Sequence, residues 1–248
     1  MPFTLAHPAA VLPFRRFCPR FFSFPALVVG SLCPDVGYCF GTLSVEDFSH
    51  SLKGSLEFCL PVGVVMLGFF YGLRVPVVEM LPERHRKNLL PFCQKPIGSP
   101  LTVLVSLLVG IWSHLLFDSF THKHGWLVEN LPALQMPVFS AGVHTFRIFN
   151  LLWYACSFAG IVWLWLAWEQ WRIVSAGQFS QTGSHLKLCR AILAGVLMIP
   201  IELTHHLVLR RTGLFLIAGY SILIVIGMVL RMRSKNPAKQ LPLNPPKN

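Results

Sequence analysis

The sequence predicts an all-α, multi-pass integral membrane protein, a helical bundle with about five transmembrane helices. The first observation is composition: 54% of the 248 residues are hydrophobic and only 12% are charged, whereas charged residues make up about 25% of an ordinary soluble domain. The second is a mean hydropathy of +0.58. The third is that apolar stretches near the roughly 18 residues needed to cross a bilayer recur along the chain.

Five stretches are long and apolar enough to be interpreted as transmembrane helices. They are Leu56–Leu73, Leu101–Phe120, Leu151–Trp168, Leu188–Leu203 and Gly213–Leu230. The fourth contains Arg190, Pro200 and Glu202, which a lipid-exposed helix tolerates poorly, so we expect it to be short or shielded by neighbouring helices. A sixth apolar stretch, Phe21–Cys33, is too short and is interrupted by Pro25. We interpret it as a buried or interfacial segment.

The chain divides into one membrane domain over residues 1–233 and a tail over residues 234–248. Within the domain, residues 1–54 form an amino-terminal block and residues 55–233 form the helical body. The tail is rich in Lys, Pro and Asn and is predicted to be disordered. The amino terminus does not resemble a signal peptide, because Arg15 and Arg16 follow several prolines and no uninterrupted apolar region leads to a cleavage site. We therefore expect it to take part in the fold.

The net charge of +11 would suit a nucleic-acid partner, but membrane proteins also collect Lys and Arg in their cytoplasmic loops. With five spans, the loops 74–100 and 169–187 and all residues after Leu230 share one side and hold 12 of the 21 basic residues. This bias predicts a cytoplasmic carboxyl terminus, although the cluster of Arg15, Arg16 and Arg20 on the other side opposes it. No basic and aromatic pattern indicates nucleic acid, so the predicted partner is the lipid bilayer.

Seven cysteines are scattered along the chain without a C-x-x-C pair. This distribution argues against a disulfide framework and against a zinc site built from cysteines. Any metal chemistry would therefore rest on histidines and carboxylates.

The carboxyl end of the second predicted span carries a polar stripe on an otherwise apolar helix. His114, Asp118 and His122 stand at positions i, i+4 and i+8, which place them on one helical face. A charged side chain at the centre of a bilayer costs about 3 kcal/mol, so the stripe needs partners. One solution is a divalent metal, which takes imidazole nitrogen and carboxylate oxygen from adjacent turns. The other is that His114 and Asp118 hydrogen-bond each other and a neighbouring helix, with His122 as an ordinary loop residue.

Three more polar residues lie on the membrane face at which the second span emerges. They are His7, Asp35 and His50, which the predicted topology brings to the same side as the polar stripe. Imidazoles and carboxylates together suit zinc, or manganese or iron if more oxygen ligands are used. Each residue also has an ordinary interpretation: His7 as an interfacial residue, Asp35 as a helix cap, and His50 as a cap of the first span.

These segments together resemble a bacterial membrane protein family, the domain of unknown function 4184. The resemblance rests on the opening Met1–Pro13, on Gly30-Ser31 with Pro34-Asp35, on His50-Ser51-Leu52 with Gly54, on Phe58–Pro61, and on Ser113-His114 with Asp118 and Thr121-His122. It covers nearly the whole chain and is least specific in the last two spans. The resemblance implies a protein of the bacterial cytoplasmic membrane. It implies no particular activity, because the family is defined by sequence alone.

A more distant similarity does imply a chemistry. The order of an early His, a Pro-Asp, a His-Ser and a Ser-His-x-x-x-Asp is similar to the LexA-binding group of inner-membrane metal-dependent hydrolases. It is also similar to zinc-dependent phospholipase C and related nucleases. By this similarity the metal residues would be His7, Asp35, His50, His114 and Asp118. The chain departs from the hydrolase pattern in having a single Asp after Pro34 and no His-Arg pair before His50, so it offers fewer ligands.

A metal at this site predicts hydrolysis, since a Lewis-acidic cation activates water and polarises a phosphoryl or acyl oxygen. Glu46 or Asp47, close to His50 in the sequence, is the predicted general base. The position at the membrane surface suggests a phosphoester or another lipid-linked substrate. Lys123 and Arg147, on the same face, could attract an anionic headgroup.

The alternative is a non-catalytic membrane protein, either a transporter or a scaffold, in which the polar stripe packs helices or lines a path. A transporter would be expected to show inverted repeats or paired broken helices, and the sequence shows neither. Glu202 and the nearby His205 and His206 fit a second polar site, an interfacial cluster or additional ligands. Substitutions distinguish the two classes, because loss of a ligand removes metal and turnover together, whereas loss of a packing residue lowers stability alone.

Overall fold

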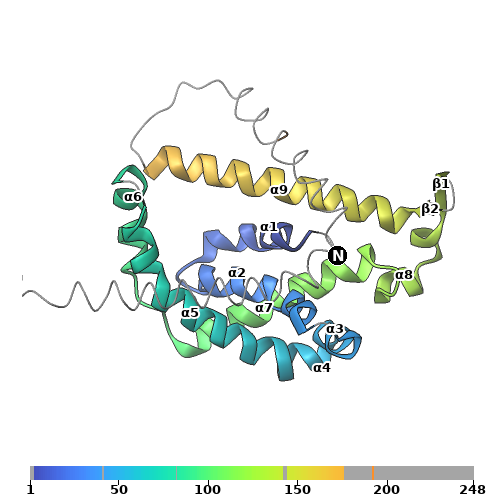
Figure 1. Cartoon of the computed structure of the whole chain (residues 1–248), viewed down its shortest axis with the longest axis horizontal. Helices are drawn as coiled ribbons and strands as arrows, with labels where there is room; N and C mark the ends of the chain where they lie inside the picture. Colours follow the sequence, from blue (N-terminus) through green and yellow to red (C-terminus); the bar gives the residue numbers. More distant parts are fainter. Residues whose placement is uncertain (1–2, 41, 82, 142–143, 176–191, 193–248) are drawn as a thin grey trace, which may run out of the picture.

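The structure is a computed structural model, and it describes residues 3–40, 42–81, 83–141, 144–175 and 192. The described residues are mostly helical, with one two-stranded sheet (Figure 1). The α-helices are α1 Pro8–Val11, α2 Phe24–Leu32, α3 Leu43–Ser49, α4 Leu52–Gly54, α5 Leu60–Glu79, α6 Glu83–Cys93, α7 Pro100–Thr121, α8 Trp126–Asn130 and α9 Ile148–Ser175. The 3-10 helices are Thr4–Ala6, Leu12–Phe17, Pro34–Phe40 and Pro132–Gln135, and a π-helical turn, Ser55–Cys59, joins α4 to α5.

Three of the described helical segments are long and apolar enough to cross a membrane: Leu52–Glu79, Pro100–Asn130 and Ile148–Trp171. They contain the first three predicted spans. The helix α5 begins, α7 ends and α9 begins at the same end of the molecule, so successive segments alternate in direction (Figure 1). The fourth and fifth predicted spans and the predicted disordered tail lie outside the described residues, apart from Ile192.

Among the described elements, α2 and α7 share the most extensive contact. Leu27 of α2 and Leu107 of α7 are completely buried. Two glycines permit the close approach, because a Cβ on Gly30 would collide with the backbone of Leu107 and one on Gly110 with the backbone of Leu27. The apolar stretch Phe21–Cys33, interpreted from the sequence as a short buried segment, therefore contains a nine-residue helix held against a candidate span.

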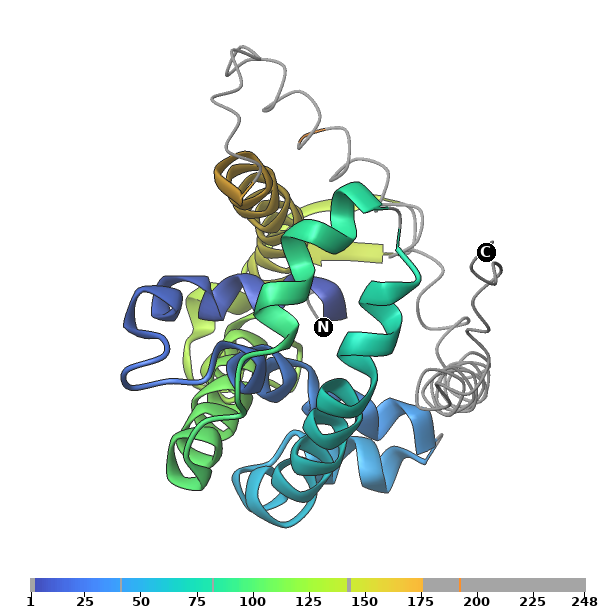
Figure 2. The ribbon, with the colours of Figure 1, turned by 90° about the vertical axis from the view of Figure 1, so that its left-hand side faces the viewer.

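The segment that contains α1 lies between the candidate spans. Both views place α1 between α9 on one side and α2 and α7 on the other (Figures 1 and 2). The Phe3 N–H donates to Ser157 Oγ of α9 at 2.9 Å, and the Ser23 N–H donates to Ser106 Oγ of α7 at 2.8 Å. These two hydrogen bonds fix both ends of the segment that contains α1.

The two-stranded antiparallel sheet is an addition to the all-α prediction. Strand β1, Pro137–Ala141, pairs with β2, His144–Arg147, directly before α9. Phe139 stands opposite Phe146, and their rings stack with centroids 4.6 Å apart, a cross-strand pair of the kind that stabilises sheets. Hydropathy counts these aromatic residues only as apolar and does not measure their preference for β-strands, so it does not predict the sheet.

Candidate metal centre

Five predicted site residues from separate parts of the chain meet near the end of α7. His7 lies between the first 3-10 helix and α1, and Asp35 lies in the 3-10 helix that follows α2. His50 ends α3, and His114 and Asp118 stand one turn apart on α7. A proline directly follows His7 and another directly precedes Asp35. Because proline is favoured in the first turn of a helix, these local sequences start a helical turn at each ligand.

The first group of converging ligand atoms belongs to Asp35, His50 and His114, and these atoms all lie within 4.8 Å of one another. His114 Nε2 lies 3.3 Å from Asp35 Oδ1, and His50 Nε2 lies 3.5 Å from the same oxygen. Two ligand atoms that are each about 2.0–2.2 Å from a tetrahedral zinc ion are about 3.3–3.6 Å from each other. The separations in this group therefore fit one divalent cation.

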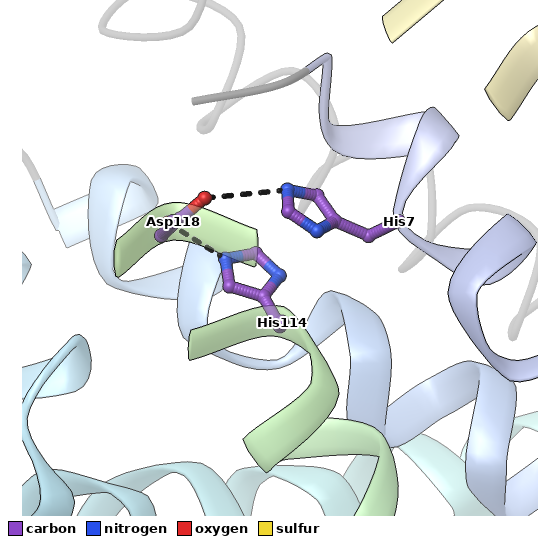
Figure 3. A group of neighbouring side chains, drawn as sticks. All are labelled: His7, His114 and Asp118. Atoms are coloured by element: carbon purple, nitrogen blue, oxygen red, sulfur yellow. Dashed lines mark ion pairs between the residues drawn. The ribbon is translucent and has the colours of Figure 1, made fainter. Parts of the chain in front are cut away.

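The second group belongs to His7, His114 and Asp118 (Figure 3). His7 Nε2 lies 3.7 Å from Asp118 Oδ1, and His114 Nε2 lies 3.2 Å from Asp118 Oδ2. The same Oδ2 lies 3.5 Å from His50 Nε2, which connects the two groups. Because His114 belongs to both groups, the five side chains form one continuous centre.

Backbone carbonyl groups orient two of the imidazoles. His114 Nδ1 lies 2.8 Å from the Ser31 carbonyl oxygen, and His50 Nδ1 lies 2.9 Å from the Glu46 carbonyl oxygen. Because a carbonyl oxygen can only accept a hydrogen bond, each Nδ1 carries the proton and donates it. In the neutral form of each ring, the lone pair is then on Nε2, the atom that faces the carboxylates. Histidines that bind metals are oriented by hydrogen bonds of this kind.

The polar atoms of the centre are buried without other partners. The exposed fraction is 3% for His7, 5% for Asp35, 0% for His114 and 7% for Asp118. Seven buried atoms have no hydrogen-bond partner outside the centre among the described residues: Nε2 of His7, His50 and His114, and both oxygens of Asp35 and of Asp118. Burying such groups without partners is costly. A divalent cation coordinated by these nitrogen and oxygen atoms would offset that cost.

The surroundings keep His7 neutral and Asp35 ionised. Burial first, and then the neighbouring His114, lower the pKa of His7 to about 3. Burial on its own raises the pKa of Asp35, but the positive charge that His114 carries when protonated, together with hydrogen bonds from His114 and His50, holds this pKa well below its usual range. Near neutral pH both residues therefore have the protonation state that a metal ligand requires.

His122, the sixth predicted ligand, lies at the edge of the centre. Its Nδ1 is 3.5 Å from Asp118 Oδ1, and its side chain is 28% exposed. The same nitrogen is 3.2 Å from the Asp118 carbonyl oxygen. His122 belongs to neither of the two groups of converging ligand atoms found among the described residues. Its role as a ligand stays a prediction.

The residues predicted to surround the metal differ in their exposure. Glu46 is half-buried and lies one helical turn before His50, whereas Asp47 is exposed. The general-base role of either residue stays a prediction. Lys123 is exposed, and Arg147 Nη1 donates a hydrogen bond to a backbone carbonyl oxygen in the Pro132–Gln135 turn at 2.7 Å, so Arg147 has a structural contact on this face.

Tyr38 is a residue of the centre that the sequence reasoning missed. Its ring centroid lies 5.3 Å from that of His50. Burial, and then the negative charge of Asp35, raise the pKa of Tyr38, so its phenol stays protonated and can donate a hydrogen bond. The spacing in the sequence is compatible with this position, because Asp35 and Tyr38 are three residues apart and a 3-10 helix has three residues per turn, which places both on one face. Recognising it required knowing that this segment is a 3-10 helix.

A sequence-family profile described as "Domain of unknown function (DUF4184)" matches residues 1–232. No curated protein and no solved structure matches the chain. The matched range includes the amino-terminal block that supplies His7, Asp35 and His50, and the helix that supplies His114 and Asp118. The whole candidate centre therefore lies inside the matched range.

Proposed function

Because the chain belongs to the DUF4184 family, a domain of unknown function, we propose its function from the site: a membrane-bound, metal-dependent hydrolase acting on a phosphoester or lipid-linked substrate at the membrane surface. One observation carries the proposal. Imidazole nitrogens and carboxylate oxygens from four separate segments converge in a buried centre, where they have no hydrogen-bond partner among the described residues. The distant similarity to membrane-associated metal-dependent hydrolases points the same way.

The first metal position is assigned to Asp35, His50 and His114. Three protein ligands of nitrogen and oxygen type are the usual set for a catalytic zinc, whose remaining position is open to water or substrate. A divalent cation bound there would act as a Lewis acid that polarises the scissile group and lowers the pKa of bound water. His50 is the ligand whose side chain is partly exposed, at 18%, so substrate would approach the ion from its side.

Two neighbouring side chains would assist the reaction. Glu46 is preferred over Asp47 as the general base, because it is half-buried and stands one helical turn from His50. Tyr38 would donate a hydrogen bond to the oxygen on which negative charge develops, since its phenol is protonated and its ring lies beside His50. The centre then combines three metal ligands with one general base and one hydrogen-bond donor.

The location supports a substrate at a membrane surface. The centre is built at the start of one candidate span, Leu52–Glu79, and within the last turns of α7 in another, Pro100–Asn130. A site at the ends of apolar helices meets the headgroup region of a bilayer, where phosphoesters are concentrated. We further propose that the chain crosses the bacterial cytoplasmic membrane several times with its carboxyl terminus in the cytoplasm, as the distribution of basic residues predicts.

The competing prediction is a transporter or scaffold in which the same residues pack helices together. Polar residues that serve only in packing are expected to hydrogen-bond across helices. Here His114 Nδ1 does so with the Ser31 carbonyl oxygen. Nε2 of His114 and both oxygens of Asp118 face only other ionisable side chains of the centre, with His114 Nε2 at 3.2 Å from Asp118 Oδ2, and among the residues described they have no hydrogen-bond partner outside the centre. This pattern favours metal ligands over packing residues.

The test is elemental analysis of the detergent-purified protein beside two variants. Asp35→Asn keeps the size of the side chain but removes the charge of a ligand, and Glu57→Gln removes the charge of an exposed residue that pairs with Lys53 at 3.8 Å. We expect at least one zinc, manganese or iron ion per chain in the parent and in Glu57→Gln, and the loss of one ion per chain in Asp35→Asn. Gel filtration confirms that each variant is folded.

The absence of bound metal in the parent, even after reconstitution with zinc, manganese and iron, would reject the hydrolase. If metal is bound, turnover is screened with bis(p-nitrophenyl) phosphate and with phospholipid vesicles. Activity that is lost in Asp35→Asn and retained in Glu57→Gln would support hydrolysis at this centre. Full metal content in Asp35→Asn would place the ion elsewhere and leave the centre as a packing feature.

A further inference from the structure

We propose that the centre holds two divalent cations rather than one, with the carboxylate of Asp118 bridging them. The first ion is the one already assigned to Asp35, His50 and His114, so this inference rests on the metal of the proposed function. Asp118 Oδ2 would be its fourth protein ligand, and water or substrate would then bind as a fifth ligand. The second ion is assigned to His7 Nε2 and Asp118 Oδ1, with His122 beside the same oxygen. Three features of the geometry lead to this division.

The first feature is that His114 can serve only one ion. Its Nδ1 donates to the Ser31 carbonyl oxygen at 2.8 Å, so Nε2 is its single nitrogen with an available lone pair. Yet His114 belongs to both groups of converging ligand atoms, one with Asp35 and His50 and the other with His7 and Asp118. If His114 ligates the ion of the first group, His7 and Asp118 are left to hold a different ion or none.

The second feature is the stacking of His7 on His114. The ring centroids are 3.7 Å apart and the ring planes differ by only 17°. An imidazole nitrogen donates its lone pair in the plane of its ring, so an ion ligated by both rings would have to lie in both planes. Two nearly parallel planes this far apart do not meet near the nitrogens. One ion shared by His7 and His114 would lie well outside both planes, whereas two ions satisfy both rings.

The third feature is the position of the two oxygens of Asp118. Oδ2 faces the first group, at 3.2 Å from His114 Nε2 and 3.5 Å from His50 Nε2. Oδ1 faces the other side, at 3.7 Å from His7 Nε2 and 3.5 Å from His122 Nδ1. A carboxylate with each oxygen turned to a different set of imidazoles is suited to bridge two ions, which in two-metal sites are about 3.5–4 Å apart.

The scaffold around His7 holds it in this second position. Its side chain is 1% exposed, and Phe3, four residues earlier in the chain, is tied to α9 through the hydrogen bond to Ser157 Oγ. A Cβ on Gly160 of α9 would lie 2.9 Å from the Cβ of Ala6, so the backbone beside His7 is in close contact with that helix. Burial of the side chain and the contacts of the neighbouring backbone with α9 therefore keep His7 Nε2 apart from the first group.

A pair of ions narrows the substrate class. Two cations at this separation stabilise the attacking and the leaving oxygen of an in-line displacement at phosphorus. Asp118 would hold the two ions at a fixed spacing. His50 and His122 have partly exposed side chains, so they mark the side from which substrate enters. The preferred substrate is accordingly a phosphate ester rather than a carboxylic ester.

The experiment is manganese titration of the metal-stripped, detergent-purified full chain, followed by elemental analysis and electron paramagnetic resonance. We expect two Mn²⁺ ions per chain in the parent, with the spectrum of a spin-coupled pair. His7→Gln is expected to bind one ion and to show the six-line signal of isolated Mn²⁺. The control is His124→Gln, because His124 has an 82% exposed side chain and lies outside the centre; it should retain two coupled ions.

The outcomes separate this inference from the proposed function. One uncoupled ion in the parent, lost in Asp35→Asn, would overturn the second site and leave the hydrolase intact. No ion in the parent would overturn both. Two coupled ions that persist in His7→Gln would overturn the assignment of His7. Because the coupled spectrum is read from the parent, the proposal can be rejected even if His7→Gln does not fold.

Discussion

Backbone carbonyl groups orient two of the imidazoles in the centre. The carbonyl oxygens of Ser31 and Glu46 fix the tautomers of His114 and His50, yet any residue type could supply a carbonyl group. Substituting Ser31 would therefore leave that hydrogen bond in place unless the backbone moved. The side chains whose chemistry is required are the ligands themselves and, on our proposal, Tyr38.

Tyr38 can be tested without disturbing the metal. Tyr38→Phe keeps the ring that lies beside His50 but removes the hydroxyl group. If the phenol stabilises charge in the transition state, kcat falls by roughly 10²-fold, the loss typical of one such donor, while KM and metal content change little. Steady-state kinetics on the phosphodiester used in the screen, together with elemental analysis, measure both effects.

The matched control is Tyr71→Phe, since Tyr71 lies in α5 and contacts Arg74, with the guanidinium 4.1 Å from the ring centroid. It should keep parental kcat. An unchanged kcat in Tyr38→Phe would remove Tyr38 from the mechanism, and an equal loss of metal and kcat would mean that the residue acts through the ligands instead.

Among the elements, the pair α2 and α7 determines whether the ligands meet. The helix α7 supplies His114 and Asp118 from adjacent turns, but Asp35 arrives only because the short helix α2 lies against α7 and ends directly before it. Contact through Gly30 and Gly110 sets the spacing of the two helix axes. Any increase in that spacing moves Asp35 away from His114.

This dependence predicts an unequal effect of two Gly→Ala substitutions. Gly110→Ala places a Cβ against the backbone of Leu27, so we expect a loss of about 1–3 kcal/mol of stability from overpacking and weaker metal binding. Gly68→Ala in α5 has no atom within 4 Å of the new Cβ, so the better helix propensity of alanine should leave stability unchanged or raise it by about 1 kcal/mol. Thermal unfolding in detergent and zinc titration measure the two quantities. Equal unfolding temperatures would show that the helices separate without cost.

For the whole molecule, composition and the number of apolar stretches predict the candidate spans and the side on which the site residues lie. Leu101–Phe120 is recognisable because a soluble core does not need so long an unbroken apolar stretch, and alternating spans bring His7, Asp35 and His50 to the side where α7 ends. The stacking of His7 on His114 could not be predicted, because it depends on how α1 is inserted between α9 and α7. Tyr38 was missed because its helix is of the 3-10 type, and the β-strands because hydropathy does not register β preference.

The orientation of the molecule in the membrane is the remaining prediction at this scale. The proposed topology would place the loop after α7, with the exposed Lys123, outside the cell, and the segment between α6 and α7, with the exposed Gln94, in the cytoplasm. After replacement of the native cysteines by alanine, we expect a membrane-impermeant maleimide to label Lys123→Cys in intact spheroplasts. The same reagent should label Gln94→Cys only after lysis, because the bilayer separates the two ends of α7.

Two other labelling results would each contradict this orientation in a different way. The reverse pattern would mean that the cluster of Arg15, Arg16 and Arg20 outweighs the basic loops in setting topology, and the centre would then face cytoplasmic substrates. Labelling of both positions in intact spheroplasts would mean that α7 does not separate two compartments. In that case the polar stripe at His114 and Asp118 would no longer lie at the end of a membrane span. The proposal of a lipid-linked substrate would then lose its support. The proposal of a metal centre would not, because it rests on the distances between the side chains.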